Sequence, residues 1–104
     1  MDTNVQVLAP AGILDSTQAA QVRTQVGEAL STGARTLLID LENITFIDSS
    51  GLGTLISVLK KVRSQDCEMA VCSASPQVKM LFELTSMDQV FRVYENRAAF
   101  EAAV

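Results

Sequence analysis

The chain has no histidine and no tryptophan among its 104 residues, and it has only two cysteines, two prolines and one tyrosine. The absence of histidine excludes Ser-His-Asp and Cys-His nucleophilic sites, imidazole general bases and most zinc sites. It also removes the side chain whose ordinary pKa would allow a switch near neutral pH. With 8 basic and 12 acidic side chains the formal net charge is −4, whereas nucleic-acid binding usually needs a basic surface. Composition therefore favours a binding or regulatory module over an enzyme or a nucleic-acid-binding protein.

Long apolar runs are absent as well. Runs such as Met69–Cys72 stop far short of the roughly 20 residues that a membrane span needs. The N-terminus has neither the basic region nor the apolar core of a signal peptide. We therefore expect a cytoplasmic protein that makes no contact with a membrane. Its length predicts a single domain over residues 1–104 that folds without a disulfide or metal.

The sulfur-containing residues are expected to be structural. Cys67 and Cys72 flank a predicted strand and, because they are five positions apart, point to opposite faces of it. That geometry excludes a disulfide within the strand, and two cysteines without histidine are too few ligands for zinc. We expect both cysteines to be small apolar fillers, and Met69, Met80 and Met87 to fill the core or its rim.

Short apolar runs alternate with amphipathic patterns along the chain. Strands are predicted at Val5–Leu8, Thr36–Asp40, Met69–Cys72 and Val90–Tyr94, with a further extended segment at Ile44–Ile47. Helices are predicted over Ser16–Leu30 and Ser50–Ser64, from Ser75-Pro76 onward, and over Arg97–Ala103. This alternation predicts an α/β fold, with a four- to five-stranded, mostly parallel sheet and about four helices packed on it.

Several residues mark where the helices begin and end. Asp15 or Ser16 can cap the first helix, and Gly33 lies where a left-handed residue would end it. Ser75 can cap the third helix with proline at its first position, and Asn96 can cap the last.

The segment Asp48–Gly53 is the part of the sequence that looks chemical, because polar residues and two glycines there follow an extended segment and open a helix. A dinucleotide-binding fingerprint fails, since its third glycine is replaced by Ile56. A nucleophile elbow also fails, because the G-x-S-x-G pattern and a histidine base are both missing. Two interpretations stay open: a regulated phosphoacceptor serine, or a plain helix cap with glycines for tight packing.

The same segment resembles the signature of STAS domains, and most closely that of bacterial anti-sigma factor antagonists. The resemblance includes the preceding strand Leu38–Leu41 and the Gly-x-Leu-Asp turn at Gly12–Asp15, which lies 33 residues upstream, counted from Asp15 to Asp48. It continues through Met69–Cys72 and Ser75–Phe82, and so covers nearly the whole chain.

The resemblance implies a regulatory binding protein that is not an enzyme and uses no cofactor or metal. In such antagonists, the serine directly after the motif aspartate is phosphorylated by an anti-sigma factor serine kinase. Here that serine is Ser49. The unphosphorylated form binds the kinase and so frees a sigma factor, whereas the phosphorylated form does not bind. A metal-dependent phosphatase of the PP2C type restores the unphosphorylated form.

Further site residues follow from the resemblance. Asp15 matches an aspartate at the kinase-binding surface, and Asp48 and Ser50 flank the acceptor. Gly51 and Gly53 are expected to keep the start of the helix open to close approach by a partner. The alternative function is an unmodified STAS scaffold in a stress or signalling complex, in which the serine only caps a helix.

One departure from the family concerns the N-terminus. The family usually has a longer segment there that forms an extra strand, whereas about eleven residues precede Gly12 here. We therefore expect a sheet with one strand fewer and an exposed edge, which would permit a homodimer.

Overall fold

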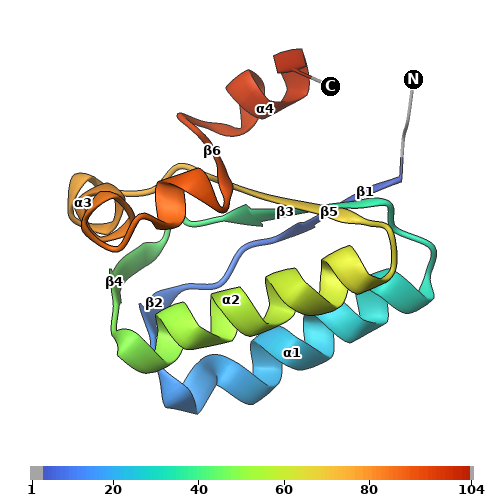
Figure 1. The fold of residues 1–104 in the computed structure, drawn as a ribbon, viewed down its shortest axis with the longest axis horizontal. Helices are drawn as coiled ribbons and strands as arrows, with labels where there is room; N and C mark the ends of the chain where they lie inside the picture. Colours follow the sequence, from blue (N-terminus) through green and yellow to red (C-terminus); the bar gives the residue numbers. More distant parts are fainter. Residues whose placement is uncertain (1–3, 104) are drawn as a thin grey trace.

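A computed structural model describes residues 4–103 as a layered α/β fold (Figure 1). Its elements, in chain order, are β1 (Val5–Leu8), β2 (Gly12–Leu14), α1 (Ser16–Ser31), β3 (Thr36–Asp40), β4 (Ile44–Ile47), α2 (Ser49–Ser64), β5 (Glu68–Cys72), α3 (Pro76–Leu84), the 3₁₀ helix η1 (Met87–Gln89), β6 (Arg92–Tyr94) and α4 (Arg97–Ala103). No helix within this part of the chain is long and apolar enough to span a bilayer.

The main sheet has four strands in the order β1-β3-β5-β6, and every neighbouring pair is parallel. This confirms the predicted α/β class and the mostly parallel sheet. β2 and β4 form a separate parallel pair. The expectation of a turn at Gly12–Asp15 was therefore incomplete, because Gly12–Leu14 form a strand. A strand of three residues that begins at a glycine with φ of +85° is too short to show a periodic pattern.

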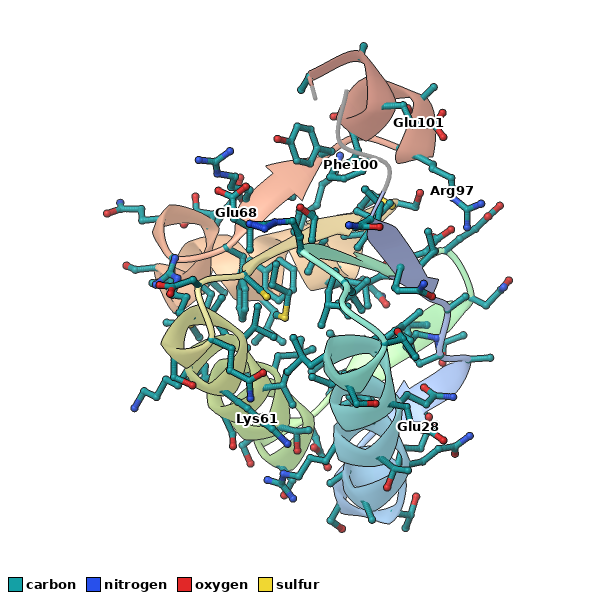
Figure 2. All side chains as sticks on the ribbon, turned by 90° about the vertical axis from the view of Figure 1, so that its right-hand side faces the viewer. Glu28, Lys61, Glu68, Arg97, Phe100 and Glu101 are labelled. Atoms are coloured by element: carbon teal, nitrogen blue, oxygen red, sulfur yellow. The ribbon has the colours of Figure 1, made fainter. Side chains whose placement is uncertain are left out.

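The helices cover the two faces of the main sheet unequally. α1 and α2 lie side by side on one face, whereas α4 lies on the opposite face (Figure 1). Side chains along β3 alternate accordingly: Leu37 and Ile39 enter the main core, and Leu38 enters a smaller cluster on the other side. Phe100 covers that smaller cluster from α4 (Figure 2), with its ring 5.4 Å from that of Tyr94. Each large apolar side chain so buried contributes about 1.5–3 kcal/mol.

The predicted helix ends are largely confirmed. Asp15 caps α1, Ser75 caps α3 with proline at the first helical position, and the Asn96 side chain accepts the N–H of Ala99 at the start of α4. Gly33 has φ of +90° just beyond α1. The last strand begins at Arg92, later than predicted, because the preceding residues form η1 and a turn.

Both cysteines carry free thiols and lie on opposite faces of the sheet, as predicted. Cys67 packs against the main core, whereas Cys72 lies in the cluster under Phe100. Burial raises the pKa of the Cys72 thiol. Met69 is 4% exposed and belongs to the core, but Met80 is 59% exposed, so the prediction that it fills the core or its rim was wrong.

Candidate functional site

The pairing of β2 with β4 brings two helix N-termini to one edge of the molecule. Leu14 and Ile47 are register partners at the ends of these parallel strands. The residue that follows each strand is an aspartate, Asp15 or Asp48, and each aspartate caps the helix that comes next. The two aspartates, which the sequence separates by 33 positions, therefore each directly follow a member of one register pair, and α1 and α2 run side by side from that point (Figure 1).

Asp48 organises the start of α2. Its side-chain Oδ1 accepts the backbone N–H of Gly51 at 2.8 Å, and its carbonyl accepts that of Leu52 at 2.9 Å. Its own N–H donates to the carbonyl of Leu14 at 3.3 Å, which fixes the cap to the end of β2. Asp48 is thus the N-cap of α2, and the helix begins at Ser49.

Ser49 and Ser50 are the first two residues of α2, and both are exposed. The first N–H groups of a helix have no acceptor within it, and no other acceptor within residues 4–103 takes those of Ser49 and Ser50. These two donors and the positive end of the helix dipole favour an anion at this position. The structure therefore places the predicted acceptor on the surface, beside unused backbone donors.

Asp15 is held in a similar cap at the start of α1. Its Oδ1 accepts the backbone N–H of Thr17 at 2.9 Å and also the Thr17 hydroxyl. The hydrogen bonds from Thr17, that of the hydroxyl first, lower the pKa of the Asp15 carboxyl from its ordinary value of 3.8. Asp15 is therefore ionised at neutral pH, and it contributes negative charge to the edge on which Ser49 lies.

The two glycines of the motif lie in different surroundings. Gly51 is buried, and a Cβ added there would lie 2.0 Å from the carbonyl oxygen of Leu14. Gly53 is exposed, and a Cβ added there would meet nothing within 4 Å. Gly51 thus allows α2 to approach β2 closely, whereas Gly53 leaves the outer surface of the helix open. The binding roles predicted for Gly51, Gly53 and Ser50 remain predictions.

An exposed apolar surface that was not predicted from the sequence adjoins the start of α2. Among residues 4–103, five large apolar side chains are exposed: Val7, Ile13, Phe46, Met80 and Leu84. The last four form what we call the apolar patch. Ile13 and Phe46 are register partners in β2 and β4, and Phe46, Met80 and Leu84 line a groove of about 330 Å³ between β4 and α3. None of the residues that line the groove is charged.

The sequence contained a signal for this patch. Met80 and Leu84 lie one turn apart on α3, and the predicted inner face of that helix already held Val78, Leu81 and Phe82. Such a short helix with apolar residues beyond one stripe has more apolar surface than the core can cover. Exposed apolar surface of this kind commonly marks a protein interaction site.

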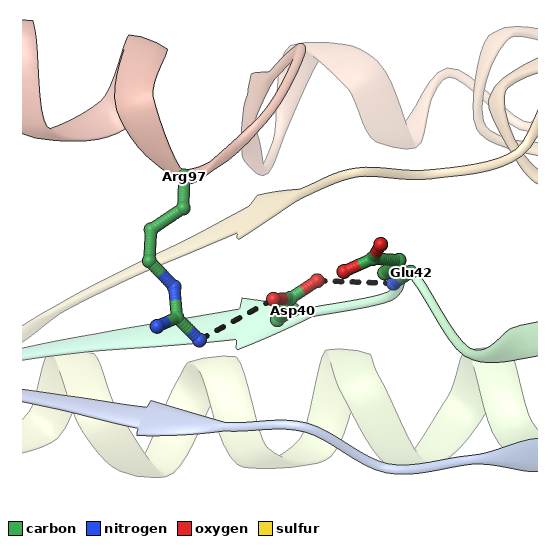
Figure 3. Close-up of polar contacts among 3 residues, drawn as sticks. All are labelled: Asp40, Glu42 and Arg97. Atoms are coloured by element: carbon green, nitrogen blue, oxygen red, sulfur yellow. Dashed lines mark hydrogen bonds and ion pairs between the residues drawn. The ribbon is translucent and has the colours of Figure 1, made fainter.

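A second polar cluster lies at the ends of β3 and β5. The Asp40 side chain accepts the backbone N–H of Glu42 at 3.0 Å and pairs with the guanidinium of Arg97 at 3.4 Å (Figure 3). Asp40 is 7% exposed, so these partners compensate a buried charge. The pair ties the first residue of α4 to the end of β3.

The comparisons with known proteins agree with this geometry. The sequence pattern of the STAS domain family matches residues 2–99. The anti-sigma F factor antagonist of Paenibacillus polymyxa is 31% identical over 93 residues, which are 88% of this chain and 80% of that protein. An anti-sigma factor antagonist from Mycobacterium paratuberculosis has the same fold, with a TM-score of 0.84 and 24% identity over 100% of this chain and 88% of that one. So does the Bacillus cell fate determinant SpoIIAA in its phosphorylated form, with a TM-score of 0.72 and 20% identity over 100% and 95% of the two chains.

Proposed function

This chain belongs to the STAS domain family, and we propose that it is an anti-sigma factor antagonist switched by phosphorylation of Ser49. In its unphosphorylated form it binds an anti-sigma factor serine kinase and so frees a sigma factor. A PP2C-type phosphatase reverses the modification. The chain itself is a regulatory binding protein, because the kinase supplies the catalytic groups that a chain without histidine lacks.

The observation that carries this proposal is the position of Ser49 in the site. Its side chain is exposed at the first position of α2, between the Asp48 cap and unused backbone N–H groups. A kinase can reach an exposed hydroxyl at a helix start without unfolding the chain. The relatives support the assignment, because one is an anti-sigma F factor antagonist and a structural neighbour has been solved in a phosphorylated form.

The fold is expected to survive phosphorylation. The modification adds about −1.5 to −2 charge at pH 7. At the start of α2 that charge meets helix N–H donors, which favour an anion by about 0.3–1 kcal/mol at an exposed site. The switch therefore acts on binding and leaves the folded state in place.

Binding is blocked because the added charge must be buried with like charges. Ser49 directly follows Asp48, and Asp15 directly follows Leu14, the register partner of Ile47. A kinase surface that covers Ser49 would bury the phosphate beside these carboxylates. Burying an uncompensated charge costs several kcal/mol, which corresponds to a loss of affinity of 100-fold or more at about 1.4 kcal/mol per tenfold.

The apolar patch supplies the attractive part of the interface. Phe46 and Ile47 line its groove, and they directly precede the cap and acceptor in sequence. A partner that inserts an apolar side chain there is brought into contact with the start of α2. Burial of such a side chain contributes about 1.5–3 kcal/mol, so the patch holds the partner and Ser49 decides whether it can bind.

Phosphate mapping tests this proposal directly. The chain is incubated with Mg-ATP and the anti-sigma factor kinases of its source organism, and the modified position is located by tandem mass spectrometry. We expect one phosphate per chain, on Ser49, with loss of the modification in Ser49→Ala and its retention in Ser50→Ala. The two serines are matched, because both are exposed in the first turn of α2. A kinase that binds the chain yet leaves Ser49 unmodified would favour the alternative of an unmodified STAS scaffold.

A further inference from the structure

The exposed side of α1 and α2 carries a cluster of unpaired cations, and we infer that it is a docking surface for an acidic segment of a partner protein. Arg23 of α1 and Lys60 and Lys61 of α2 form this cluster, which we call the basic surface. All three residues are exposed. The basic surface is separate from the apolar patch, and the inference does not depend on the proposed function.

Charge is distributed unevenly along the chain. α1 and α2 together contain four basic residues and a single acidic one, Glu28, whereas the rest of the sequence contains 4 basic and 11 acidic residues. Glu28 lines a groove with Gln6 and Leu8, so it faces β1 and not the basic surface. A chain of net charge −4 therefore has one pair of helices whose own charge is positive.

The three cations of the basic surface lie close together because Lys61 reaches from α2 to α1 (Figure 2). A Cβ added at Gly27 of α1 would lie 3.6 Å from the Lys61 Nζ, so the ammonium group lies over that glycine. Arg23 precedes Gly27 by one helical turn and is on the same side of α1. Lys60 directly precedes Lys61 on the exposed side of α2.

The fold does not account for this cluster. Within residues 4–103, three ion pairs hold Lys79, Arg92 and Arg97, and no residue of the basic surface takes part in one. The helix dipole favours Lys61 in the last turn of α2, but it does not favour Arg23, which lies in the middle of α1. Like charges that share a surface repel each other. The cluster therefore needs an anionic partner from outside the described chain to be neutralised.

An acidic polypeptide fits this surface better than a membrane or a nucleic acid does. A helix that binds a membrane surface has apolar side chains beside its cations. The large apolar side chains that are exposed within residues 4–103 lie instead on β1, β2, β4 and α3. A nucleic-acid-binding protein commonly neutralises about 6–10 phosphates, more than three cations on an acidic chain can contact. Carboxylates of Asp and Glu pair with single Lys and Arg side chains.

The basic surface is within reach of a partner that also contacts the start of α2. Lys60 lies eleven positions after Ser49 in the same helix, which corresponds to about 16 Å along its axis. About five residues of extended chain span that distance. The exposed residues between them include Gly53 and Ser57, which are small and leave room for a polypeptide to pass.

NMR titration of the ¹⁵N-labelled chain tests the inference. The probe is a synthetic peptide of alternating glutamate and serine, and the control peptide has glutamine in place of glutamate. At low salt the glutamate peptide should shift the backbone amide signals around Arg23, Gly27 and Lys61, and the glutamine peptide should not. Physiological salt should weaken binding about tenfold, because exposed ion pairs are screened. Equal binding of the two peptides, or shifts centred on Lys79 and Arg92, would overturn the inference.

Variants that remove one charge separate the basic surface from the net charge of the chain. Arg23→Gln and Lys61→Gln should each weaken binding of the glutamate peptide at least threefold, and Lys61→Arg should bind as wild type does. Arg92→Gln is the matched control, because it removes the same charge from a side chain that is 69% exposed on β6, and it should leave binding unchanged. All four variants should keep the far-UV circular dichroism of wild type. An equal loss of affinity in Arg92→Gln would contradict a localised site.

Two other anionic probes test the class of partner. Vesicles that contain phosphatidylserine and a short duplex DNA are titrated at the same salt concentration, and both should bind more weakly than the glutamate peptide. Tighter binding of either at the basic surface would assign it to a membrane or to a nucleic acid and overturn the choice of an acidic protein segment. No kinase enters these measurements, so their outcome is independent of whether Ser49 is phosphorylated.

Discussion

The contact between Gly51 and Leu14 determines how the two helix starts come together, and a pair of glycine variants measures its contribution. In Gly51→Ala the new Cβ would lie 2.0 Å from the carbonyl oxygen and 2.7 Å from the carbonyl carbon of Leu14. Both are backbone atoms, so β2 must move away from α2 to relieve the clash. In Gly53→Ala, two residues later in the same helix, the new Cβ meets nothing within 4 Å.

The expected free energies have opposite signs. Alanine is a better helix former than glycine by about 0.8–1 kcal/mol, so Gly53→Ala should stabilise the protein by up to about 1 kcal/mol. Gly51→Ala gains the same helix propensity, but overpacking costs about 1–3 kcal/mol or more. The cost should lie at the upper end of that range, because the new Cβ meets backbone atoms. We therefore expect it to be about 1–2 kcal/mol less stable than wild type and about 2–3 kcal/mol less stable than Gly53→Ala.

Thermal and urea unfolding, followed by far-UV circular dichroism, measure this difference. For a domain of about 100 residues, 1 kcal/mol corresponds to roughly 4 °C in Tm, so the two variants should melt about 8–12 °C apart. The urea m-value should stay the same in both, because neither change alters the surface exposed on unfolding. Equal Tm values for Gly51→Ala and Gly53→Ala would show that the close approach of α2 to β2 is not what requires glycine.

Three further predictions concern the patch, the cap and the thiols. Leu84→Ser should weaken kinase binding at least tenfold in isothermal titration, because Leu84 is 79% exposed in the patch, while Val7→Ser, outside the patch, should bind as wild type does. Unchanged binding by Leu84→Ser would remove the patch from the interface. Because its native pKa lies below 3.8, ionised Asp15 contributes stability that is present above pH 3.8 and is lost as the pH falls through that lower native value. Urea unfolding should therefore show that the free energy of unfolding lost in Asp15→Ala becomes smaller only in that acidic range. A loss that is constant with pH would contradict the cap geometry. Cys67 should react with a thiol reagent in the folded protein, whereas Cys72, which is buried and has a raised pKa, should react only on unfolding; equal reaction rates would contradict its burial.

Much of the fold and of the site edge could be predicted from the sequence because the signals are local. Asp15 and Gly33 mark the ends of α1 by side-chain and backbone preferences that need no tertiary contact. The segment Asp48–Gly53 was found in the same way, from polar residues before an amphipathic helix. The resemblance to STAS domains then related Ser49 to phosphorylation.

The features that the sequence did not reveal depend on tertiary contacts. β2 is a strand only because β4 lies beside it, and its three residues carry no period of their own. The buried position of Gly51 follows from where Leu14 lies, which no pattern within α2 specifies. Met80 is apolar and was expected in the core or at its rim, but the position of α3 beside β4 leaves it facing solvent. Exposure of an apolar residue is set by the packing of whole elements, so the surplus of apolar residues on α3 indicates exposed surface without specifying which residues form it.

Displacement of a sigma factor tests the central claim most directly. A complex of the anti-sigma factor kinase with its sigma factor is prepared from the source organism, and the chain is titrated into it while the release of labelled sigma factor is followed by fluorescence anisotropy. The unphosphorylated chain and Ser49→Ala should release the sigma factor, whereas Ser49→Asp and the chain phosphorylated on Ser49 should require at least 100-fold more protein, with folds indistinguishable by circular dichroism. Equal release by the phosphorylated and unphosphorylated chains, or release by neither, would contradict the account.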